Sequence, residues 1–426
     1  MILLLLLINT LLITVSLFIC LFNNYRKYQV LVYYAFIQLF YLLYSPWYNY
    51  LNNDFSAFNT ELTHLDFQIG LFILFLHLIF FYQGYFFYNY FRFKRKNINY
   101  RNNLDFNLKN KVSKIYIIFF VIIAINAAFG DVSLYDILLG KNDTETLGFK
   151  GGTNWISSMA DSLLILMLMS QFYKSSKIIR LILFPLTIFL FLILGFRYRL
   201  LLIIFGFVFI YLKDHILKAK QVMKVFLILL ISFYLFMFFS ENRISFYSNK
   251  LDNLTYNFVD FHYESIHDNA LGSIVDFAMF KNIREGNSNH DFGQSMFVYP
   301  IIMILPSSIF LNSEKPYPAP QIITIDKSLD VPRSYGQACT FIGMSFYAYS
   351  FFGVIIFSFL FGIFASYLEF YNDNNLTFFF KLAFLLASFQ LYTRGYLGLF
   401  LLPLAFMLLP LIIMKYKLVF KKDLNR

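Results

Sequence analysis

Apolar runs recur along almost the whole chain, and their length is the feature that most restricts what the chain can fold into. A helix needs about 20 apolar residues to cross the ~30 Å hydrocarbon core of a bilayer, where only helices and closed barrels satisfy their own backbone hydrogen bonds. Of the 426 residues, 59% are hydrophobic and 14% are charged. This composition excludes a soluble globular protein and predicts an all-α polytopic integral membrane protein.

About eleven segments have the composition of a transmembrane helix, although several are shorter than usual and must extend into flanking polar residues. The first has no basic region before its apolar part and no small-residue cleavage pattern, so we predict a retained helix rather than a signal peptide. The segments are approximately 2–22, 30–45, 67–88, 115–130, 156–173, 181–196, 200–212, 225–239, 350–368, 376–392 and 396–414.

The basic residues gather in alternate loops. If the N-terminus lies outside, most of the 35 Lys and Arg lie inside, including those of the loop FRFKRKNINYR and of the tail from Lys415. The positive-inside rule therefore predicts an outer N-terminus and an inner C-terminus. The net charge of +11 sets topology and does not indicate a nucleic-acid partner.

One long interruption divides the chain into three regions: 1–239 with helices 1–8, 240–343 as an outer loop, and 344–426 with helices 9–11 and a basic tail. Within the loop, LDNLTYNFVDFHYESIHDNALGSIVDFAMF has a helical pattern and predicts interfacial helices. MFVYPIIMILPSSIF is short and broken by two prolines, which favours an interfacial or re-entrant segment. We expect TFIGMSFYAYSFFG to lie at the outer interface, before the true helix begins.

Arginines stand where the predicted outer ends of helices fall. Arg197 and Arg199 form the tip of a hairpin between two apolar segments, Arg394 caps another, and Arg333 precedes the return into the membrane. Guanidinium groups bind phosphate bidentately, so four such arginines at one depth suit a lipid diphosphate. In the alternative interpretation they extend to headgroups, or one pairs with Asp161.

The outer loop offers candidates for acid and base chemistry. The segment HYESIHDN is the densest, and helical spacing places Glu264, His267 and Asp268 on one face, where they are candidate catalytic residues. A solvated polar face is the alternative. No metal site or cofactor is expected, since no ligand motif accompanies the loop histidines, and we interpret His77 as a hydrogen-bonded core histidine.

These features resemble the Wzy-type polymerases of bacterial surface polysaccharides. The resemblance lies in about eleven helices, a G-x-R tip (Gly195, Arg197), one long outer loop, the re-entry segment RSYGQACTFIGMSFYAYSFFGVIIF and a late Arg394-Gly395 tip. The family often has a small residue inside the G-x-R tip, where this chain has Phe196. By this match Arg197 and Arg394 would hold the undecaprenyl diphosphate of the substrate, with Arg199 and Arg333 as weaker candidates.

The resemblance implies a GT-C-like membrane glycosyltransferase in the bacterial inner membrane, with its N-terminus periplasmic and its C-terminus cytoplasmic. Such an O-antigen polymerase, an enzyme of lipopolysaccharide or capsule-like polysaccharide biosynthesis, joins undecaprenyl-diphosphate-linked oligosaccharide repeat units at the periplasmic face. Membrane lipids, a flippase and a chain-length regulator would be its partners. A diphosphate is a good leaving group, so arginine could replace a metal.

Two other classes remain open. An O-antigen ligase moves a finished glycan onto lipid A core, and His267-Asp268-Asn269 followed by Gly272 is a partial match to the histidine motif of ligases. A transporter, such as a lipid-oligosaccharide flippase, would place polar residues through the depth of many helices and often has two symmetric halves. The ionisable residues of this chain lie instead near predicted helix ends and in one loop, and no repeat is visible.

Overall fold

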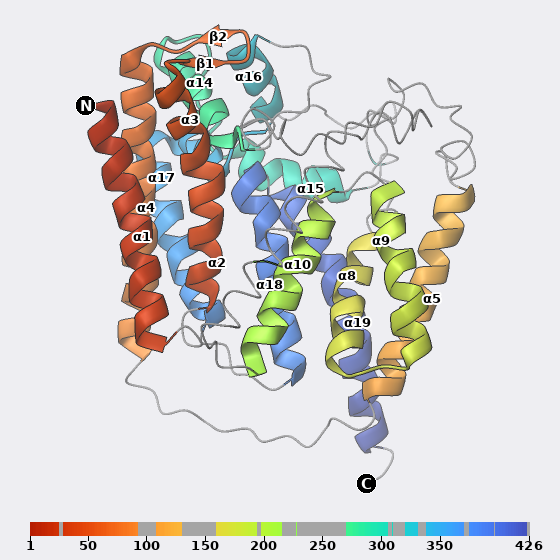
Figure 1. Cartoon of the computed structure of the whole chain (residues 1–426). Helices are drawn as coiled ribbons and strands as arrows, with labels where there is room; N and C mark the ends of the chain where they lie inside the picture. Colours follow the sequence, from red (N-terminus) through yellow and green to blue (C-terminus); the bar gives the residue numbers. More distant parts are fainter. Residues whose placement is uncertain are drawn as a thin grey trace. The chain divides into compact units, whose positions relative to one another are not determined.

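The structure is a computed structural model, and the residues that it describes are mostly helical (Figure 1). Their only sheet is a two-stranded antiparallel hairpin. The described residues are 1–24, 29–92, 108–129, 159–193, 197–214, 227, 270–305, 309, 320–330, 338–369, 375–395 and 397–423.

Helices occupy the described parts of ten of the eleven predicted segments, and the remaining segment, 225–239, lies outside the described residues apart from residue 227. Four apolar helices of the described part have only 10 to 17 residues, fewer than the five long ones given below. The helical membrane character expected from the sequence is therefore confirmed. Within the described ranges, five helical runs are long and apolar enough to cross a membrane: Ile2–Ile19, Gln29–Asn52, His64–Phe91, Phe341–Glu369 and Asn375–Arg394.

The chain divides into two compact units that are interleaved in sequence. Unit 1 comprises 1–99, 266–371 and 387–401, and unit 2 comprises 100–265, 372–386 and 402–426. Two helices, α18 (Asn375–Arg394) and α19 (Gly398–Asp423), contribute residues to both units. Each unit is described by itself below.

Unit 1 is built around closely packed helices from the two ends of its sequence. Gly84 of α4 and Gly362 of α17 make the close approach possible, because a Cβ at either position would collide with a backbone carbonyl of the other helix. Small residues serve this purpose at helix interfaces in membranes. The bundle comprises α1 (Ile2–Asn24), α2 (Gln29–Ile37), the π-helix η2 (Gln38–Leu43), α3 (Tyr44–Asn52), α4 (His64–Arg92) and α17 (Phe341–Glu369).

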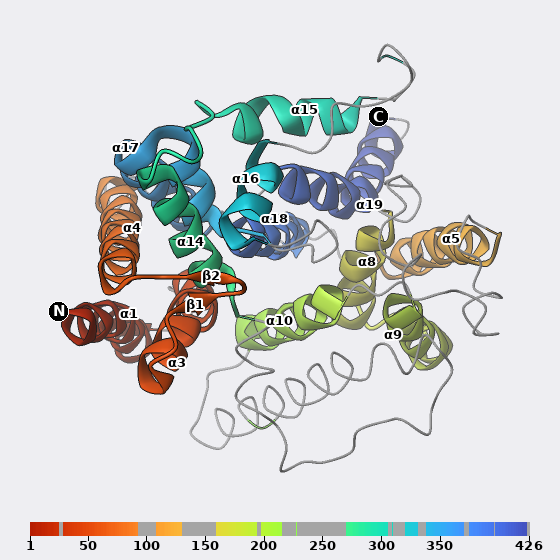
Figure 2. The ribbon, with the colours of Figure 1, turned by 90° about the horizontal axis from the view of Figure 1, so that it is seen from above.

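Short elements cover one end of this bundle, where α14 lies over the ends of α4 and α17 (Figure 2). In the hairpin, Ser56 pairs with Glu61 and Ala57 with Thr60. Lys281 of α14 donates to the Glu61 carbonyl at 2.8 Å, which ties the hairpin to that helix. The short elements of unit 1 are β1 (Ser56–Ala57), β2 (Thr60–Glu61), α14 (Gly272–Arg284), η5 (Gln294–Val298), α15 (Tyr299–Ile304) and α16 (Pro320–Leu329), and α15 continues from η5 rather than covering the bundle.

A carboxylate at the end of α17 caps the start of α2. Glu369 accepts hydrogen bonds from the backbone N–H groups of Val30 and Leu31 at 2.7 and 3.2 Å. The Tyr85 hydroxyl donates to the same carboxylate oxygen at 3.3 Å. The first N–H groups of a helix have no partner within it and favour negative charge, so this long-range cap joins residues 1–99 of unit 1 to residues 266–371.

Helix α17 consists of two arms that meet at Tyr349 and Ser350, where the backbone leaves the helical region. The rings of Phe341 and Phe361 lie only 5.0 Å apart, whereas 20 residues of straight helix would separate them by about 30 Å. The arms therefore fold back on each other. Every residue of the first arm, 341–348, is buried, so this stretch, which we call the re-entrant arm because it turns back into the bundle, packs inside unit 1. Its expected position at the outer membrane interface stays a prediction.

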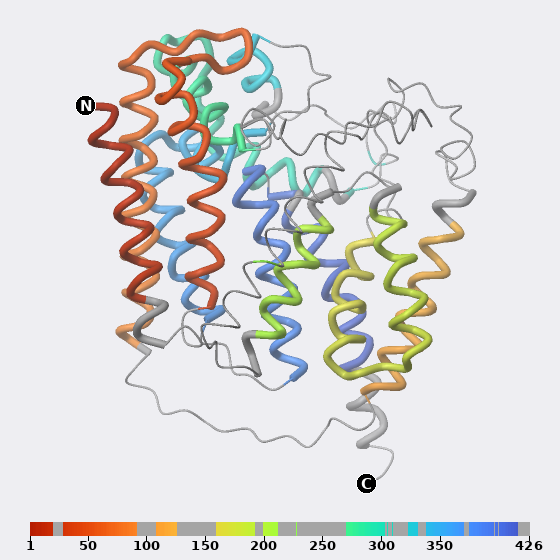
Figure 3. The backbone as a smooth tube through the Cα atoms, viewed as in Figure 1, coloured from red at the N-terminus to blue at the C-terminus, as the bar shows by residue number. Residues whose placement is uncertain are grey.

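Unit 2 contains a second group of helices, in which α5, α8 and α9 run side by side (Figure 3). The Tyr116 hydroxyl of α5 lies 2.7 Å from the Thr187 hydroxyl of α9. Gly206 of α10 faces Leu168 of α8, and a Cβ at that glycine would overlap the Leu168 methyl groups unless Leu168 moved. The elements are α5 (Leu108–Phe129), α8 (Ala160–Phe172), the π-helix η3 (Ile179–Leu183), α9 (Phe184–Ile193) and α10 (Arg197–Asp214).

Candidate functional site

The structure describes only part of the predicted site. Glu264, His267, Asp268 and Arg333 lie outside the described residues. Arg197 is the first residue of α10, but its side chain lies outside the described part as well. The side chains of the other two candidate arginines are described, Arg199 in unit 2 and Arg394 in unit 1.

Arg199 is buried and paired. Its Nε donates to the Asp161 carboxylate at 2.7 Å, and only 1% and 2% of the two side chains are exposed. The guanidinium also lies 5.4 Å from the centre of the Phe191 ring, within the range of a cation–π interaction. The pairing with Asp161 that the sequence left open is thus confirmed for Arg199. A diphosphate at Arg199 would have to compete with this carboxylate.

Arg394 is exposed at the C-terminal end of α18. The following residue, Gly395, has a φ of 56° and donates its N–H to the Leu391 carbonyl at 2.9 Å, as is usual for a glycine that ends a helix. A Cβ at Gly395 would collide with the Thr340 carbonyl. Both the backbone conformation and the contact with Thr340 therefore require glycine directly after Arg394.

Thr340 precedes the re-entrant arm and is held by Asp276 of α14. The Asp276 carboxylate accepts the Thr340 N–H at 2.8 Å and the Thr340 hydroxyl at 2.5 Å, and it also accepts the Gly343 N–H. These donors make the carboxylate the cap of the re-entrant helix. Burial raises the pKa of Asp276 from its ordinary value of 3.8 to about 7, although the hydrogen bonds from Thr340 and Gly343 oppose this shift.

The start of α14 lies against the same joint. At Gly272 a Cβ would lie 2.8 Å from the Thr340 methyl group and 3.7 Å from the Thr393 carbonyl, so the first turn of α14 touches the end of α18. Ser45 donates its hydroxyl to the Ala270 carbonyl at 2.9 Å. One turn before Ser45, Tyr41 lies close enough to Arg394 for the guanidinium to act on its hydroxyl electrostatically.

We define the α18 joint as the contact among the end of α18 (393–395), Thr340, the start of α14 (270–276) and the face of η2 and α3 that carries Tyr41 and Ser45. All of these residues belong to unit 1. Four segments that are more than 50 residues apart along the chain therefore meet around the exposed Arg394. The joint therefore brings together the Arg394 cation, the N-terminus of α14 and the buried carboxyl group of Asp276.

A buried chain of polar side chains leads from this joint into the bundle. Gln38 donates to the Tyr392 hydroxyl at 2.9 Å, and this hydroxyl also lies 2.5 Å from Nε2 of His77. Nδ1 of His77 lies 2.7 Å from the Ser358 hydroxyl. Both ring nitrogens thus have a partner, which confirms that His77 is a hydrogen-bonded core histidine. One turn before Tyr392 and Gln38, Ser388 and Tyr34 form a parallel contact at 2.6 Å.

No protein-family model, curated protein or solved structure matches the chain. Among the described residues, no group of three or more His, Cys, Asp or Glu side chains could hold a metal ion. The α18 joint can bind an anion through Arg394 and the start of α14, and Asp276 holds its two backbone segments together.

Sequence reasoning did not select the residues that assemble the joint. Asp276 is one of several acidic residues in the loop. The candidate catalytic residues come from the HYESIHDN segment because its polar residues are denser. The distinguishing signal of Asp276 is its place within GSIVDFAMF, where a charge on an otherwise apolar helix face predicts a buried partner. Thr340 and Ser273 carry no such signal, because hydroxyl groups are common in helices of this kind.

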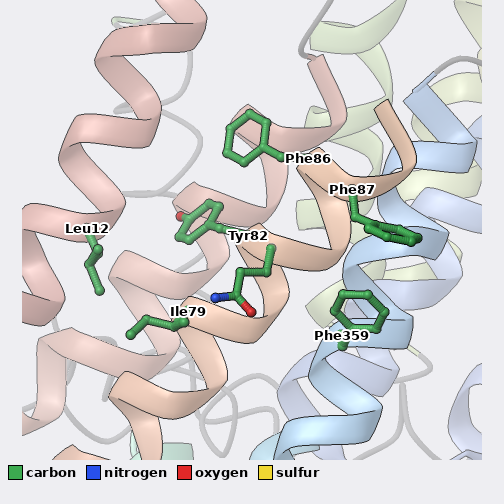
Figure 4. Close-up of a pocket in the computed structure, with 7 residues that line it drawn as sticks. Leu12, Ile79, Tyr82, Phe86, Phe87 and Phe359 are labelled. Atoms are coloured by element: carbon green, nitrogen blue, oxygen red, sulfur yellow. The ribbon is translucent and has the colours of Figure 1, made fainter. Parts of the chain in front are cut away.

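Unit 1 also has an open depression of about 580 Å³ on the faces of α1, α4 and α17 (Figure 4). Its lining is almost wholly apolar and contains no acidic or basic side chain. It lies on helices that are apolar enough to cross a membrane, so hydrocarbon is its natural contact. The lining residues are Leu12, Ile79, Tyr82, Gln83, Phe86, Phe87 and Phe359.

Proposed function

We propose that the protein is a membrane glycosyltransferase of the GT-C-like type that polymerises undecaprenyl-diphosphate-linked oligosaccharide repeat units at the periplasmic face of the bacterial inner membrane. The observation that carries the proposal is the α18 joint. There an exposed arginine stands at a helix end, and a glycine turn and a buried aspartate fix the backbone around it. An arginine whose backbone is held rigidly is suited to binding a diphosphate.

The reaction requires little beyond such an arginine and a base. A hydroxyl of the acceptor sugar forms a new bond to the anomeric carbon of the donor glycan, and the bond from that carbon to the lipid diphosphate breaks. The hydroxyl proton passes to a base, and the diphosphate leaves with the bonding electrons. Arg394 stabilises the negative charge that grows on the diphosphate. Glu264, His267 and Asp268 remain the candidates for the base.

Asp276 has a different part in this proposal. Its carboxyl group is 2% exposed and receives three hydrogen bonds, so it does not contact the substrate. It positions Arg394 indirectly, since it holds Thr340 and Thr340 packs on Gly395. Arg197, Arg199 and Arg333 remain weaker candidates for the diphosphate, and Arg199 would first have to leave Asp161.

The charge distribution within unit 2 supports the proposed topology of eleven crossings with a cytoplasmic C-terminus. Asp161 and Arg199 lie in the first turns of α8 and α10, and the exposed Lys174 and Lys177 follow the other end of α8. The 13 residues of α8 correspond to about 20 Å. The positive-inside rule favours basic residues at the cytoplasmic end, so in this proposal Asp161 and Arg199 face the periplasm.

The test is polymerisation by the purified full-length protein in detergent with a defined lipid-linked repeat unit, with product length read on a gel. We expect a ladder from the wild type. Arg394→Gln should give no product longer than the starting unit, and Arg394→Lys should lose most activity because lysine keeps the charge but not the planar fork. The matched control is Lys327→Gln, which removes one exposed positive charge from α16.

A normal ladder from Arg394→Gln would exclude Arg394 from the site. Addition of lipid A core to the same reaction distinguishes a polymerase from a ligase, which is the nearest alternative. A ligase transfers the glycan to the core without lengthening it, whereas a polymerase lengthens it with or without the core.

A further inference from the structure

The first turn of α14 has no side-chain cap. Its N-cap residue, Leu271, makes no side-chain hydrogen bond to the helix, and the first turn contains no acidic residue. Ile274 and Val275 donate their N–H groups to the Leu271 carbonyl, but no described residue accepts the N–H groups of Gly272 and Ser273. Free N–H groups at the start of a 13-residue helix attract an anion.

A second observation points to a ligand at the same place. The Ser273 side chain is only 1% exposed, yet its hydroxyl has no hydrogen-bond partner. Buried hydroxyl groups in folded proteins are almost always hydrogen-bonded. Because side chains of a helix lean toward its N-terminus, this hydroxyl adds a third donor to the two N–H groups of the first turn.

Arg394 supplies the charge beside these donors. The backbone of Thr393 approaches within 3.7 Å of the Cβ position of Gly272, so the guanidinium extends from the residue next to the contact. The nearest acidic residue of α14, Asp276, is occupied by Thr340 and Gly343. Glycine at 272 is needed because a side chain there would press against the Thr340 methyl group.

We propose that the first turn of α14 and Arg394 together form a diphosphate-binding subsite. The N–H groups of Gly272 and Ser273 and the Ser273 hydroxyl bind one phosphate group, and the Arg394 guanidinium binds the other. The inference rests on the proposed function for the identity of the ligand, because only a lipid-linked donor makes a diphosphate the natural anion here. It adds that α14 is a second component of the diphosphate site.

The experiment measures binding of two probes to the full-length protein in detergent by calorimetry, without any turnover. Inorganic pyrophosphate tests for the diphosphate group alone. Geranylgeranyl diphosphate, with geranylgeraniol as the uncharged control, tests for a lipid-linked diphosphate. Tighter binding of the prenyl compound than of pyrophosphate assigns the site to a lipid, whereas equal binding assigns it to a soluble diphosphate.

The key variant is Ser273→Asp, which places a carboxylate among the same donors. Arg394→Gln, at an exposed residue, is the second variant and leaves the buried packing unchanged. In Ser273→Asp the carboxylate interacts favourably with the first turn of the helix. We expect it to weaken the binding of both diphosphates at least tenfold, as Arg394→Gln should. The matched control, Asn289→Asp, adds the same charge at an exposed position beyond the opposite end of α14 and should leave both affinities unchanged.

The combined results test the diphosphate subsite and the proposed polymerase activity independently. Wild-type affinity in Ser273→Asp, or the absence of diphosphate binding in the wild type, overturns the subsite. If Ser273→Asp and Arg394→Gln both lose binding but the wild type forms no polymer, the subsite stands and the polymerase proposal fails. If polymer forms and only Arg394→Gln loses binding, the polymerase proposal stands without α14.

Discussion

The buried carboxyl group of Asp276 should make the α18 joint depend on pH. Burial raises the pKa of Asp276 to about 7 in the folded protein, whereas the unfolded chain has the ordinary value of 3.8. Between these values the folded protein keeps a proton that the unfolded chain has released. The free energy of unfolding therefore falls as the pH rises through this window, and the contribution is complete below about pH 4 and absent above about pH 7.

The size of the effect follows from the pKa. A tenfold difference in proton affinity is worth 1.36 kcal/mol, so the whole contribution of Asp276 is about 4 kcal/mol. About 3 kcal/mol of this lies between pH 5 and pH 8, which corresponds to roughly a hundredfold change in the population of the opened joint. Asp276→Asn removes the titration, and its amide can still accept the Thr340 N–H and donate to the Thr340 hydroxyl.

Cys339 provides a local assay of this opening. It is a buried cysteine directly before Thr340, and Cys20 is the only other cysteine in the sequence. In a Cys20→Ala background, the rate at which a maleimide labels Cys339 reports how often the joint opens. Division by the labelling rate of a free thiol at each pH corrects for the thiolate fraction.

For the wild type, we expect the corrected labelling rate to rise roughly a hundredfold from pH 5 to pH 8. Asp276→Asn should show a much flatter profile. Asp330→Asn, which changes an exposed aspartate in the turn after α16, should follow the wild type. Parallel profiles for the wild type and Asp276→Asn would refute the reasoning, because Asp276 would then have no part in the pH dependence.

Three further predictions concern stability in unit 1 and unit 2. Asp161→Asn should lower the free energy of unfolding by about 3 to 5 kcal/mol in denaturant titrations because it leaves Arg199 buried without its carboxylate, whereas Asp161→Leu combined with Arg199→Met should recover most of the loss. Glu369→Ala removes the cap of α2 and should lower the free energy of unfolding by about 1 to 2 kcal/mol in the same titrations. An unchanged free energy would contradict the role of Glu369 as a cap. Ser350→Gly should raise the thermal unfolding midpoint and Ser350→Val lower it, because residue 350 has a φ of 56° and a ψ of −146°; equal midpoints would exclude strain at this position.

The helices could be predicted because hydrophobic length is a local property of the sequence. The segment expected at 2–22 became α1, and the one expected at 376–392 became α18. The turn in α17 could not be predicted in this way. The apolar run from Phe341 to Glu369 has the composition of one long helix, and the reversal at Ser350 becomes visible only through contacts between distant rings such as those of Phe341 and Phe361.

The candidate site was partly accessible for the same reason. Arg394 stands out because a charge interrupts apolar sequence, and Asp161 was a reasonable partner for Arg199 because both fall near the same ends of neighbouring helices. The α18 joint was not accessible, since it depends on Asp276 meeting Thr340 across 64 residues. Such a pairing is decided by packing and leaves no periodic signal in the sequence.

The interleaving of unit 1 has a consequence for synthesis. Tyr34 and Gln38 are bonded to Ser388 and Tyr392, each 354 residues later in the chain. At about 5 to 20 residues per second, a ribosome needs about 20 to 70 s to reach those partners. During that time polar groups of the first helices remain in or near the membrane without their final hydrogen bonds. A chain that stops before α18 therefore cannot complete the hydrogen bonds of its own core.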